Sequence, residues 1–364
     1  MNRTALMWPG APMALASAAL FGASTPFAKL LLGTVDPWLL AGLLYLGSGI
    51  GLGLVQLARL PLGIGAAEAP LRRADMPWLA LVVLAGGVVG PVLLMFGLTR
   101  TSAANAALLL NLEGLATMAI AWVVFRENVD RRILLGALAI LAGAVLLSWQ
   151  GGPAGVGWGA LLIAGACVAW GIDNNLTRKL SGADPVQIAM LKGLAAGAVN
   201  LGIALTRGAV PSAPATLLGA GLIGFLGYGV SLTLFVLALR HLGTARTGAY
   251  FSTAPFIGGA VAVVLFGEPV TARLLGAALL MAIGIALHLL ERHEHEHVHG
   301  EMTHEHVHGE MTHEHVHGHD EHHQHAHAPD DSPGEPHVHV HRHTRLAHRH
   351  PHYPDLHHRH EHGG

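Results

Sequence analysis

Long apolar runs separated by short polar segments make up the first 290 residues of this 364-residue chain. A helix needs about 20 mostly apolar residues to cross the hydrocarbon core of a bilayer. Ten runs approach or reach this length, at 11–32, 37–58, 77–97, 102–125, 131–149, 157–178, 185–206, 214–239, 246–266 and 271–290. Their many Gly residues suit membrane helices, because small residues let helix backbones approach closely. The pattern predicts an all-α integral membrane protein with ten transmembrane helices.

The basic residues of the short loops indicate how these helices are oriented, because Lys and Arg concentrate in cytoplasmic loops. With the N-terminus inside, eleven of the sixteen Lys and Arg residues before position 291 fall on the cytoplasmic side and four on the other. The sixteenth, Lys192, lies within the seventh run. We therefore expect a multi-pass protein of the cell (inner or plasma) membrane with both termini in the cytoplasm.

An internal repeat relates the two halves of the apolar region. Residues 98–146 match residues 239–287 at a constant offset of 141. The matched positions are Phe125, Glu127, Val129, Arg132 and Gly143 with Phe266, Glu268, Val270, Arg273 and Gly284. Since each half holds five helices, an odd number, the second half crosses the membrane in the opposite sense, and inverted repeats are a transporter architecture. We predict two inverted five-helix repeats, residues 1–150 and 151–290, followed by a tail of residues 291–364.

This organisation resembles the drug/metabolite transporter (DMT) superfamily, in the form of a permease with two EamA-type domains. The likeness covers roughly residues 11–290 and rests on two sets of five helices, on Phe-x-Glu at the ends of helices four and nine, and on the stretch APFIGGAVAVVLFGE that starts at Ala254. It implies a secondary transporter, and the substrates of the superfamily range over sugars, amino acids, nucleotide derivatives and drugs. The first half departs from the family pattern, because Glu113-Gly114 stands where the second half has Ala254-Pro255.

Three ionisable residues lie well inside the predicted spans, namely Glu113, Asp173 and Lys192. A charge in hydrocarbon is costly, so each of them suggests a functional site. Glu113 is about 11 residues, or about 16 Å, from either end of its span. A carboxyl at that depth can serve as the proton-binding group of a proton-coupled exporter. The alternative is a structural carboxyl bonded to a neighbouring helix, with Thr117 one turn away on the same face.

The other two ionisable residues belong to helices six and seven. Asp173 and Asn174 begin a polar cluster, completed by Asn175, about one turn from the cytoplasmic end of helix six. This position favours interfacial anchoring over substrate binding. Lys192 lies about eight residues inside helix seven and is expected either to pair with Glu113 or Asp173, or to bind an anionic substrate.

A proline in helix nine marks a second candidate region. Pro255 cannot donate to the carbonyl of Phe251, so it interrupts the helical hydrogen bonds there. Tyr250 and Ser252 next to this break, and Asn111 at the position equivalent to Ser252, are candidates to line a central substrate cavity. The alternative is a kink that serves packing alone, with the hydroxyls bonded to the freed backbone.

The tail has a different composition, since residues 291–364 hold 26 of the 28 His residues. The nonapeptide HEHVHGEMT starts at His295 and again at His304, and such low complexity predicts disorder. In an extended segment, residues i and i+2 share a face, so the alternating imidazoles suit binding of Zn, Ni, Co or Cu. The candidate metal ligands are His295, His297, His299, His304, His306, His308, His313, His315 and His317. HEHVH also matches the HExxH pattern of zinc proteases, but a repeat rich in Gly supplies neither the packed helix nor the third ligand.

Several functional classes are disfavoured by the composition. A net charge of -2 gives no reason to expect nucleic-acid binding, and no nucleophile elbow occurs in the spans, so we expect no enzyme activity and no required cofactor. The sequence favours a proton-coupled exporter of a small organic metabolite, embedded in the lipid bilayer, with divalent metal ions bound at its tail. The alternatives are a divalent-metal efflux protein, for which the spans offer few ligands, and a membrane metal-binding or sensor protein. The oligomeric state stays open, with a homodimer among the options.

Overall fold

The chain forms two compact units, residues 1–291 and 292–364. The computed structural model describes residues 10–59, 71–125, 131–149, 155–180, 183–210, 213–242 and 244–289 of the first unit. In the second unit it describes residues 294–299, 302–308, 337–343 and 346–351. The candidate metal ligands His313, His315 and His317 lie outside the described residues.

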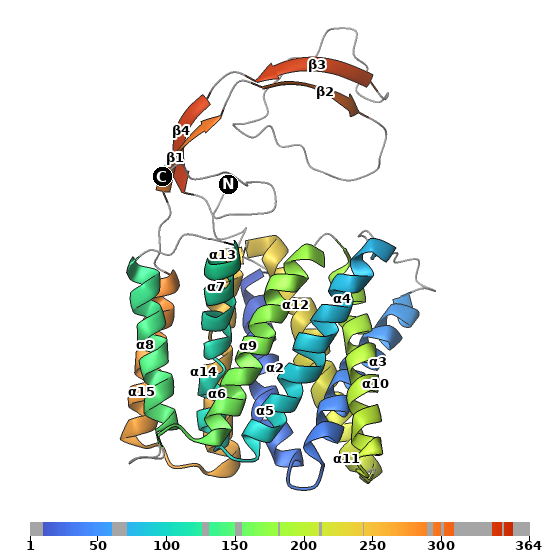
Figure 1. Cartoon of the computed structure of the whole chain (residues 1–364), viewed down its shortest axis with the longest axis vertical. Helices are drawn as coiled ribbons and strands as arrows, with labels where there is room; N and C mark the ends of the chain where they lie inside the picture. The colour runs from blue at the N-terminus through green and yellow to red at the C-terminus, as the bar shows by residue number, and fades with distance from the viewer. Residues whose placement is uncertain are drawn as a thin grey trace. The chain divides into compact units, whose positions relative to one another are not determined.

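Helices account for all the regular elements of the first unit over its described residues (Figure 1). The ten spans are α2 (Gly10–Leu31); α3 (Pro37–Arg59); α4 (Met76–Val82), η3 (Val83–Val89) and α5 (Gly90–Leu98); α6 (Ala103–Leu109) and α7 (Leu112–Phe125); α8 (Arg131–Ser148); α9 (Trp158–Thr177); α10 (Pro185–Thr206); α11 (Pro214–Gly224), η6 (Phe225–Val230) and α12 (Ser231–Leu242); α13 (Thr244–Phe251) and α14 (Ala254–Phe266); and α15 (Ala272–Leu289). Single 3-10 turns, η2 (Arg73–Asp75) and η5 (Arg178–Leu180), precede α4 and follow α9. Among these described residues, eight helices are long and apolar enough to cross a membrane, and shorter apolar helices cover 254–266 and 272–288. The predicted ten-helix membrane fold is confirmed.

Irregular backbone occurs at equivalent places in both halves. The π-helical turns η3 and η6 interrupt the third and eighth spans, and the offset of 141 carries residues 83–89 onto 224–230. The fourth and ninth spans are broken at residues 110–111 and 252–253. Pro255 in the first turn of α14 accounts for the second break, as the sequence predicts. At the first break the Asn111 amide donates to the Leu108 carbonyl at 2.9 Å and so replaces a helical hydrogen bond.

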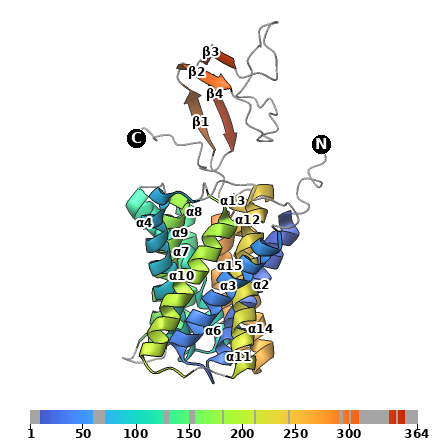
Figure 2. The same cartoon turned by 90° about the vertical axis from the view of Figure 1, so that its right-hand side faces the viewer.

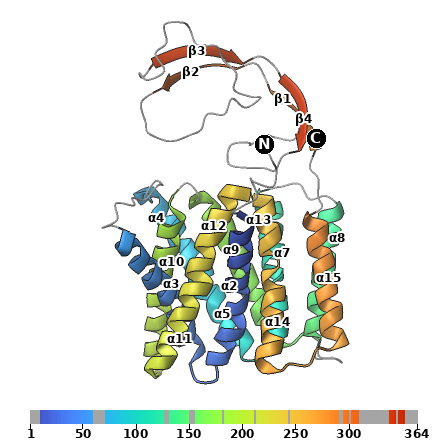
Figure 3. The ribbon, with the colours of Figure 1, turned by 180° about the vertical axis from the view of Figure 1, so that it is seen from behind.

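Equivalent helices of the two repeats pack against each other in pairs. α3 packs on α10, and α8 packs on α15, which stand side by side at one edge of the unit in Figures 1 and 3. Figure 2, turned by 90°, shows α3 and α10 adjacent as well. A methyl group on Gly143 of α8 would lie 2.9 Å from the Ala277 carbonyl oxygen of α15, and one on Gly284 would lie 2.6 Å from the Gly136 carbonyl oxygen. Because 143 and 136 correspond to 284 and 277, these contacts are the reciprocal pair that a two-fold relation between inverted repeats requires.

The Phe-x-Glu motif of the second repeat ties the two repeats together at one end of the bundle. Glu268 accepts hydrogen bonds from the backbone amides of Ala103 at 2.7 Å and Ala104 at 3.0 Å, which start α6. These amides have no helical partners of their own, so the carboxylate caps α6. Lys29 donates to the Leu98 carbonyl at 2.7 Å and so caps the end of α5 nearby. Glu127, the equivalent of Glu268, lies outside the described residues.

Some glycines lie where two helices touch and a larger side chain would clash. α11 carries one such glycine, Gly224, and one that faces open space, Gly219. A methyl group on Gly224 would overlap the Leu44 carbonyl oxygen of α3, whereas one on Gly219 would meet nothing within 4 Å. Since backbone cannot shift as a side chain can, we expect Gly224→Ala to destabilise the protein by about 1–3 kcal/mol. Gly219→Ala should change stability by less than about 0.5 kcal/mol. Thermal unfolding of the detergent-purified variants measures both, and equal stability of the two would contradict the α3–α11 contact.

The described residues of the second unit form four short strands. β1 (Glu294–His299) pairs with β4 (Leu346–Pro351), and β2 (Met302–His308) pairs with β3 (His337–His343), both antiparallel. These segments differ from the disordered tail that the low complexity predicts. The physical reason lies in the alternation of His with other residues, because a period of two is the period of a strand.

Candidate functional site

An ion pair between two helices lies inside the membrane unit. The Lys192 ammonium of α10 contacts Asp173 Oδ2 of α9, and the two side chains are only 16% and 6% exposed. The Thr177 hydroxyl, one turn further along α9, bonds to Asp173 Oδ1 at 3.2 Å. Of the two partners predicted for Lys192, Asp173 is therefore the one that it contacts. The interpretation of Asp173 as an interfacial anchor is wrong, because its carboxylate points into the bundle and is neutralised there.

The side-chain amide of Asn174 connects the Glu113 carboxyl of α7 to α9, the helix that carries Asp173. Asn174 Nδ2 donates to Glu113 Oε1 at 3.1 Å and lies 3.2 Å from Thr117 Oγ1. The Thr117 hydroxyl donates to the Glu113 main-chain carbonyl at 2.9 Å. Glu113 also lies within electrostatic range of Asp173 and Lys192. The structure thus brings Glu113, Asp173, Asn174 and Lys192 together in one polar group on α7, α9 and α10.

Asn174 differs from the other members of this polar group in its exposure. Asn174 follows Cys167 by two turns and Trp170 by one turn, so it lies on the same face of α9 as these two buried side chains. The lipid-facing side of α9 carries instead the exposed side chains of Val168 and Ile172. Asn174 is nevertheless exposed. Asn174 lies close to the end of α9 at Thr177 and is the most exposed member of the polar group.

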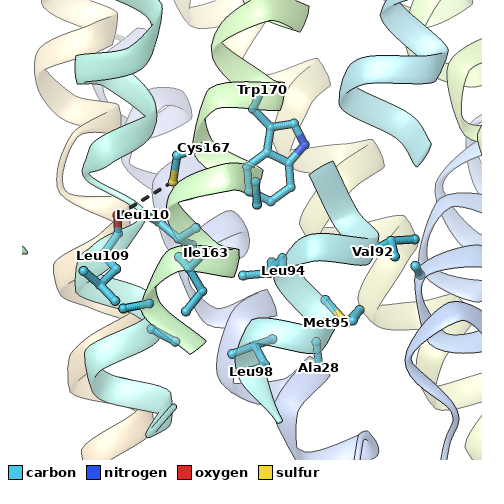
Figure 4. Packing of buried hydrophobic residues seen from close by; sticks show 14 of the residues in the cluster. Ala28, Val92, Leu94, Met95, Leu98, Leu109, Leu110, Ile163, Cys167 and Trp170 are labelled. Carbon is cyan, nitrogen blue, oxygen red and sulfur yellow. Dashed lines mark hydrogen bonds between the residues drawn. The ribbon is translucent and has the colours of Figure 1, made fainter. Parts of the chain in front are cut away.

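The opposite side of the polar group is closed by apolar packing. Figure 4 shows the side chains of Cys167 and Ile163 on α9 packed with Leu94 and Leu98 of α5 and with Leu109 of α6. All five are buried, and the Cys167 thiol donates to the Leu109 carbonyl at 3.7 Å. Apolar packing therefore shields the polar group on the side toward Ile163, whereas Asn174 is exposed.

The π-turn η3 supplies a further set of polar contacts beside the ion pair. Its Gly86 carbonyl accepts hydrogen bonds from Tyr45 OH at 2.6 Å and Trp170 Nε1 at 3.0 Å, and its Gly87 carbonyl accepts one from Asn200 Nδ2 at 2.9 Å. A π-turn frees carbonyls from the α-helical pattern, so side chains from α3, α9 and α10 satisfy them. These residues are not among the site residues predicted from the sequence. The available signal was the Gly86-Gly87 pair in the middle of an apolar span.

Aromatic rings connect this region with the second repeat. Tyr228 in η6 lies 5.4 Å from the Tyr45 ring and 6.1 Å from the Phe21 ring, between centroids. Phe21 in turn lies 5.4 Å from Phe251, at the end of α13. The equivalent π-turns thus contribute unlike groups, backbone acceptors from the first repeat and an aromatic wall from the second.

The remaining predicted site residues make their contacts elsewhere. Asn111 is buried and also lies 3.5 Å from the Met281 sulfur of α15. Tyr250 packs beside Ala14 and Leu242, and its carbonyl accepts the Thr253 hydroxyl at 2.6 Å. Ser252 sits in the break between α13 and α14 and is half-buried. The carbonyl that Pro255 leaves without a helical donor is that of Phe251, so the Thr253 hydroxyl bonds to a neighbouring carbonyl instead.

No group of three or more His, Cys, Asp or Glu suited to a metal ion occurs among the residues that the structure describes. For the tail candidates His295, His297, His299, His304, His306 and His308, the structure gives the position in the strands only. Metal binding by the tail therefore stays a prediction.

A bundle of inverted repeats with broken helices, and with ionisable side chains between them, is the architecture of a secondary transporter. The chain belongs to the EamA-like transporter family, whose sequence pattern matches residues 8–149 and 157–290. The resemblance found in the sequence is confirmed, and the protein is a multi-pass membrane transporter.

Similar proteins include an uncharacterised transporter of Methanothermobacter thermautotrophicus, 28% identical over 73% of this chain and 81% of the relative. A probable terminal-alkyne amino-acid exporter of Streptantibioticus cattleyicolor is 26% identical over 65% of this chain and 82% of its own length. A shorter match, 41% identical over 21% of this chain and 65% of the relative, is to a probable 4-amino-4-deoxy-L-arabinose-phosphoundecaprenol flippase subunit of Pseudomonas paraeruginosa. One solved crystal structure superposes with a TM-score of 0.56 at 20% identity, over 79% of this chain and 97% of that one, and shows the same fold.

Proposed function

We propose that this transporter exports a small organic metabolite in exchange for protons, with Glu113 as the proton-binding carboxyl. The observation that carries the proposal is the hydrogen bond between Glu113 and Asn174, because it joins an intramembrane carboxyl to an exposed polar side chain. The neighbouring Asp173–Lys192 pair and the Tyr45–Tyr228 wall supply charged and aromatic contacts for an organic substrate. Two relatives named as an exporter and a flippase subunit act on organic molecules, which agrees with this substrate class.

The charges of the polar group suggest how proton and substrate are exchanged. Asp173 and Lys192 neutralise each other, so an ionised Glu113 leaves one negative charge in the group. Such a charge is costly in a membrane interior and is relieved either by a proton or by a polar group of the substrate. Because a substrate and a proton would relieve the same charge, only one of them binds at a time. Each can then move across the membrane only when the other has left, so the two move in opposite directions.

Transport by reconstituted vesicles tests the proposal. Vesicles with an imposed pH gradient are screened with amino acids, nucleosides, sugars and divalent ions, using the full chain and a variant that ends at residue 290. We expect accumulation of one organic class, dependent on the gradient and retained without the tail. Flux of Zn²⁺ or Ni²⁺ that Glu113→Gln abolishes would instead establish the rival function of metal efflux. The His content of the tail is the observation that favours this rival.

A membrane metal sensor is the second rival, and we expect neither enzyme activity nor a required cofactor. In a sensor the tail would be the working part, and the membrane unit would move no solute. A metal-dependent change in the tail, with no flux of any of the screened solutes, would favour it.

We further propose that the protein lies in the inner or plasma membrane and that the end of the bundle at which α9 terminates faces the cytoplasm. α9 ends there and is followed by the basic pair Arg178-Lys179, which the distribution of charged loops places inside. Both termini then lie on the cytoplasmic side, because ten spans return the chain to its starting face.

Labelling of an introduced cysteine tests this orientation, because the native thiol should contribute little reaction. The native Cys167 is fully buried, so the wild-type chain should react slowly with a membrane-impermeant maleimide. Asn174→Cys should react in inside-out vesicles and much less in right-side-out vesicles. Leu161→Cys, exposed on the lipid side of α9, is the matched control and should react slowly in both, because thiolates form poorly in hydrocarbon. Preferential labelling of Asn174→Cys from the outside would contradict the orientation.

A further inference from the structure

We propose that strands β2 and β3 of the tail form a histidine ladder that binds Zn²⁺ or a similar imidazole-preferring divalent ion. The proposal deepens the metal-binding role expected of the tail and assigns it to a particular set of residues. It rests on the pairing register of the strands. That register places His304 opposite His341, His306 opposite His339, and His308 opposite His337.

Over the paired positions 303–308 and 337–342, the register separates His from all other residue types. In an antiparallel pair, directly opposite residues share a face, and successive residues of a strand alternate between faces. One face of the ladder therefore carries the six His positions. The other face carries Thr303, Glu305 and Val307 opposite Arg342, Val340 and Val338. A slip of one residue would pair each of the six His with a different residue type and so would remove all three His–His pairs.

The second pair of strands repeats the arrangement. The register of β1 with β4 places His295 opposite His350 and His297 opposite His348. The intervening pair, Glu296 with Arg349, joins opposite charges on the other face. Two separate strand pairs thus align His with His, although the partner segments lie about 30 to 55 residues apart in the chain.

The spacing of such a ladder suits tetrahedral metal coordination. Opposite residues of an antiparallel pair have Cβ atoms about 4.5–5.5 Å apart, and residues i and i+2 are about 6.5 Å apart along a strand. Two adjacent pairs, His304–His341 and His306–His339, therefore bring four His positions together on one face of the strand pair. Zinc takes four such ligands with Zn–N distances of about 2.0–2.1 Å. Binding would also hold β2 to β3, because a metal that requires both strands stabilises their pairing.

The test is a titration with Zn²⁺ of full-length protein in detergent, which compares variants of equal composition. The host carries Gln at the tail His positions outside these six, so that other imidazoles do not mask the site. Exchange of His306 with Val307 (H306V/V307H) keeps six His but moves one imidazole to the other face. We expect at least a ten-fold loss of affinity. Exchange of Thr303 with Glu305 (T303E/E305T), within the face that lacks His, is the matched control and should leave affinity unchanged.

A second exchange, of Val338 with His339 (V338H/H339V), restores the pairing when it is combined with the first, because the two displaced imidazoles then stand opposite each other at positions 307 and 338. We expect this four-substitution variant to recover part of the affinity. Equal affinity of all the variants would overturn the ladder, because a tail without register binds metal according to its His content alone. That result would leave the metabolite proposal standing, since proton-driven flux is measured in the membrane unit.

Discussion

Lys192→Met is expected to destabilise the membrane unit by about 3–5 kcal/mol, because it leaves the buried Asp173 carboxylate without its counter-ion. Among the residues that the structure describes, the Thr177 hydroxyl would still bond to that carboxylate, but a hydroxyl does not neutralise a charge. Transport should be lost as well, since the polar group would then hold an uncompensated acid beside Glu113. Thermal unfolding of the purified protein, followed by Trp fluorescence, and flux in vesicles measure the two effects.

The double variant Asp173→Leu/Lys192→Met separates the cost of a lone charge from the loss of the pair. Replacement of a buried ion pair by apolar residues of similar volume is often neutral or stabilising. We therefore expect the double variant to unfold near the wild-type temperature while transport stays lost. If it were as unstable as Lys192→Met, the instability would come from lost packing, and the ion pair would not be the reason why these residues are there.

The fold was largely predictable because apolar run length and the repeat determine it. Ten runs gave ten helical spans, and Pro255 gave the break between α13 and α14. The π-turns η3 and η6 were not predictable from run length, because a π-turn adds one residue to a helix without changing its hydropathy. Once the structure shows that both occur at the same repeat position, the Gly86-Gly87 and Gly227-x-Gly229 sequences mark them.

The site was only partly predictable, because the sequence does not give the rotation of each helix about its axis. Asn111 lies in the break between α6 and α7, whereas Glu113 lies in the first turn of α7, and the sequence does not show how such a break turns the chain. In the structure Asn111 contacts Met281 and Glu113 contacts Asn174. Asp173 was assigned to the interface from its distance along the chain to the helix end, whereas its burial depends on α10 beside it.

Glu113→Gln is expected to abolish accumulation of substrate driven by a pH gradient while it preserves exchange of labelled for unlabelled substrate. The Gln side chain has the same shape, and its amide oxygen can still accept the hydrogen bond that Asn174 donates to Glu113. It cannot bind or release a proton, so the step that couples flux to the gradient is removed while the binding contacts remain. Glu113→Asp is the matched control, because it keeps a titratable carboxyl on a shorter stem and should retain gradient-driven flux at a reduced rate.

Accumulation and exchange, measured together, distinguish the roles that Glu113 could have. Loss of both in Glu113→Gln would assign the carboxyl to substrate binding or to folding, and thermal unfolding of the variant would distinguish these. Gradient-driven accumulation that persists in Glu113→Gln would show that the proton is carried elsewhere, and the proposed role of Glu113 would then be wrong. Asp173 would be the next carboxyl to test, since it is the other acidic residue in this polar group, and its charge balance with Lys192 would then have to change during the transport cycle.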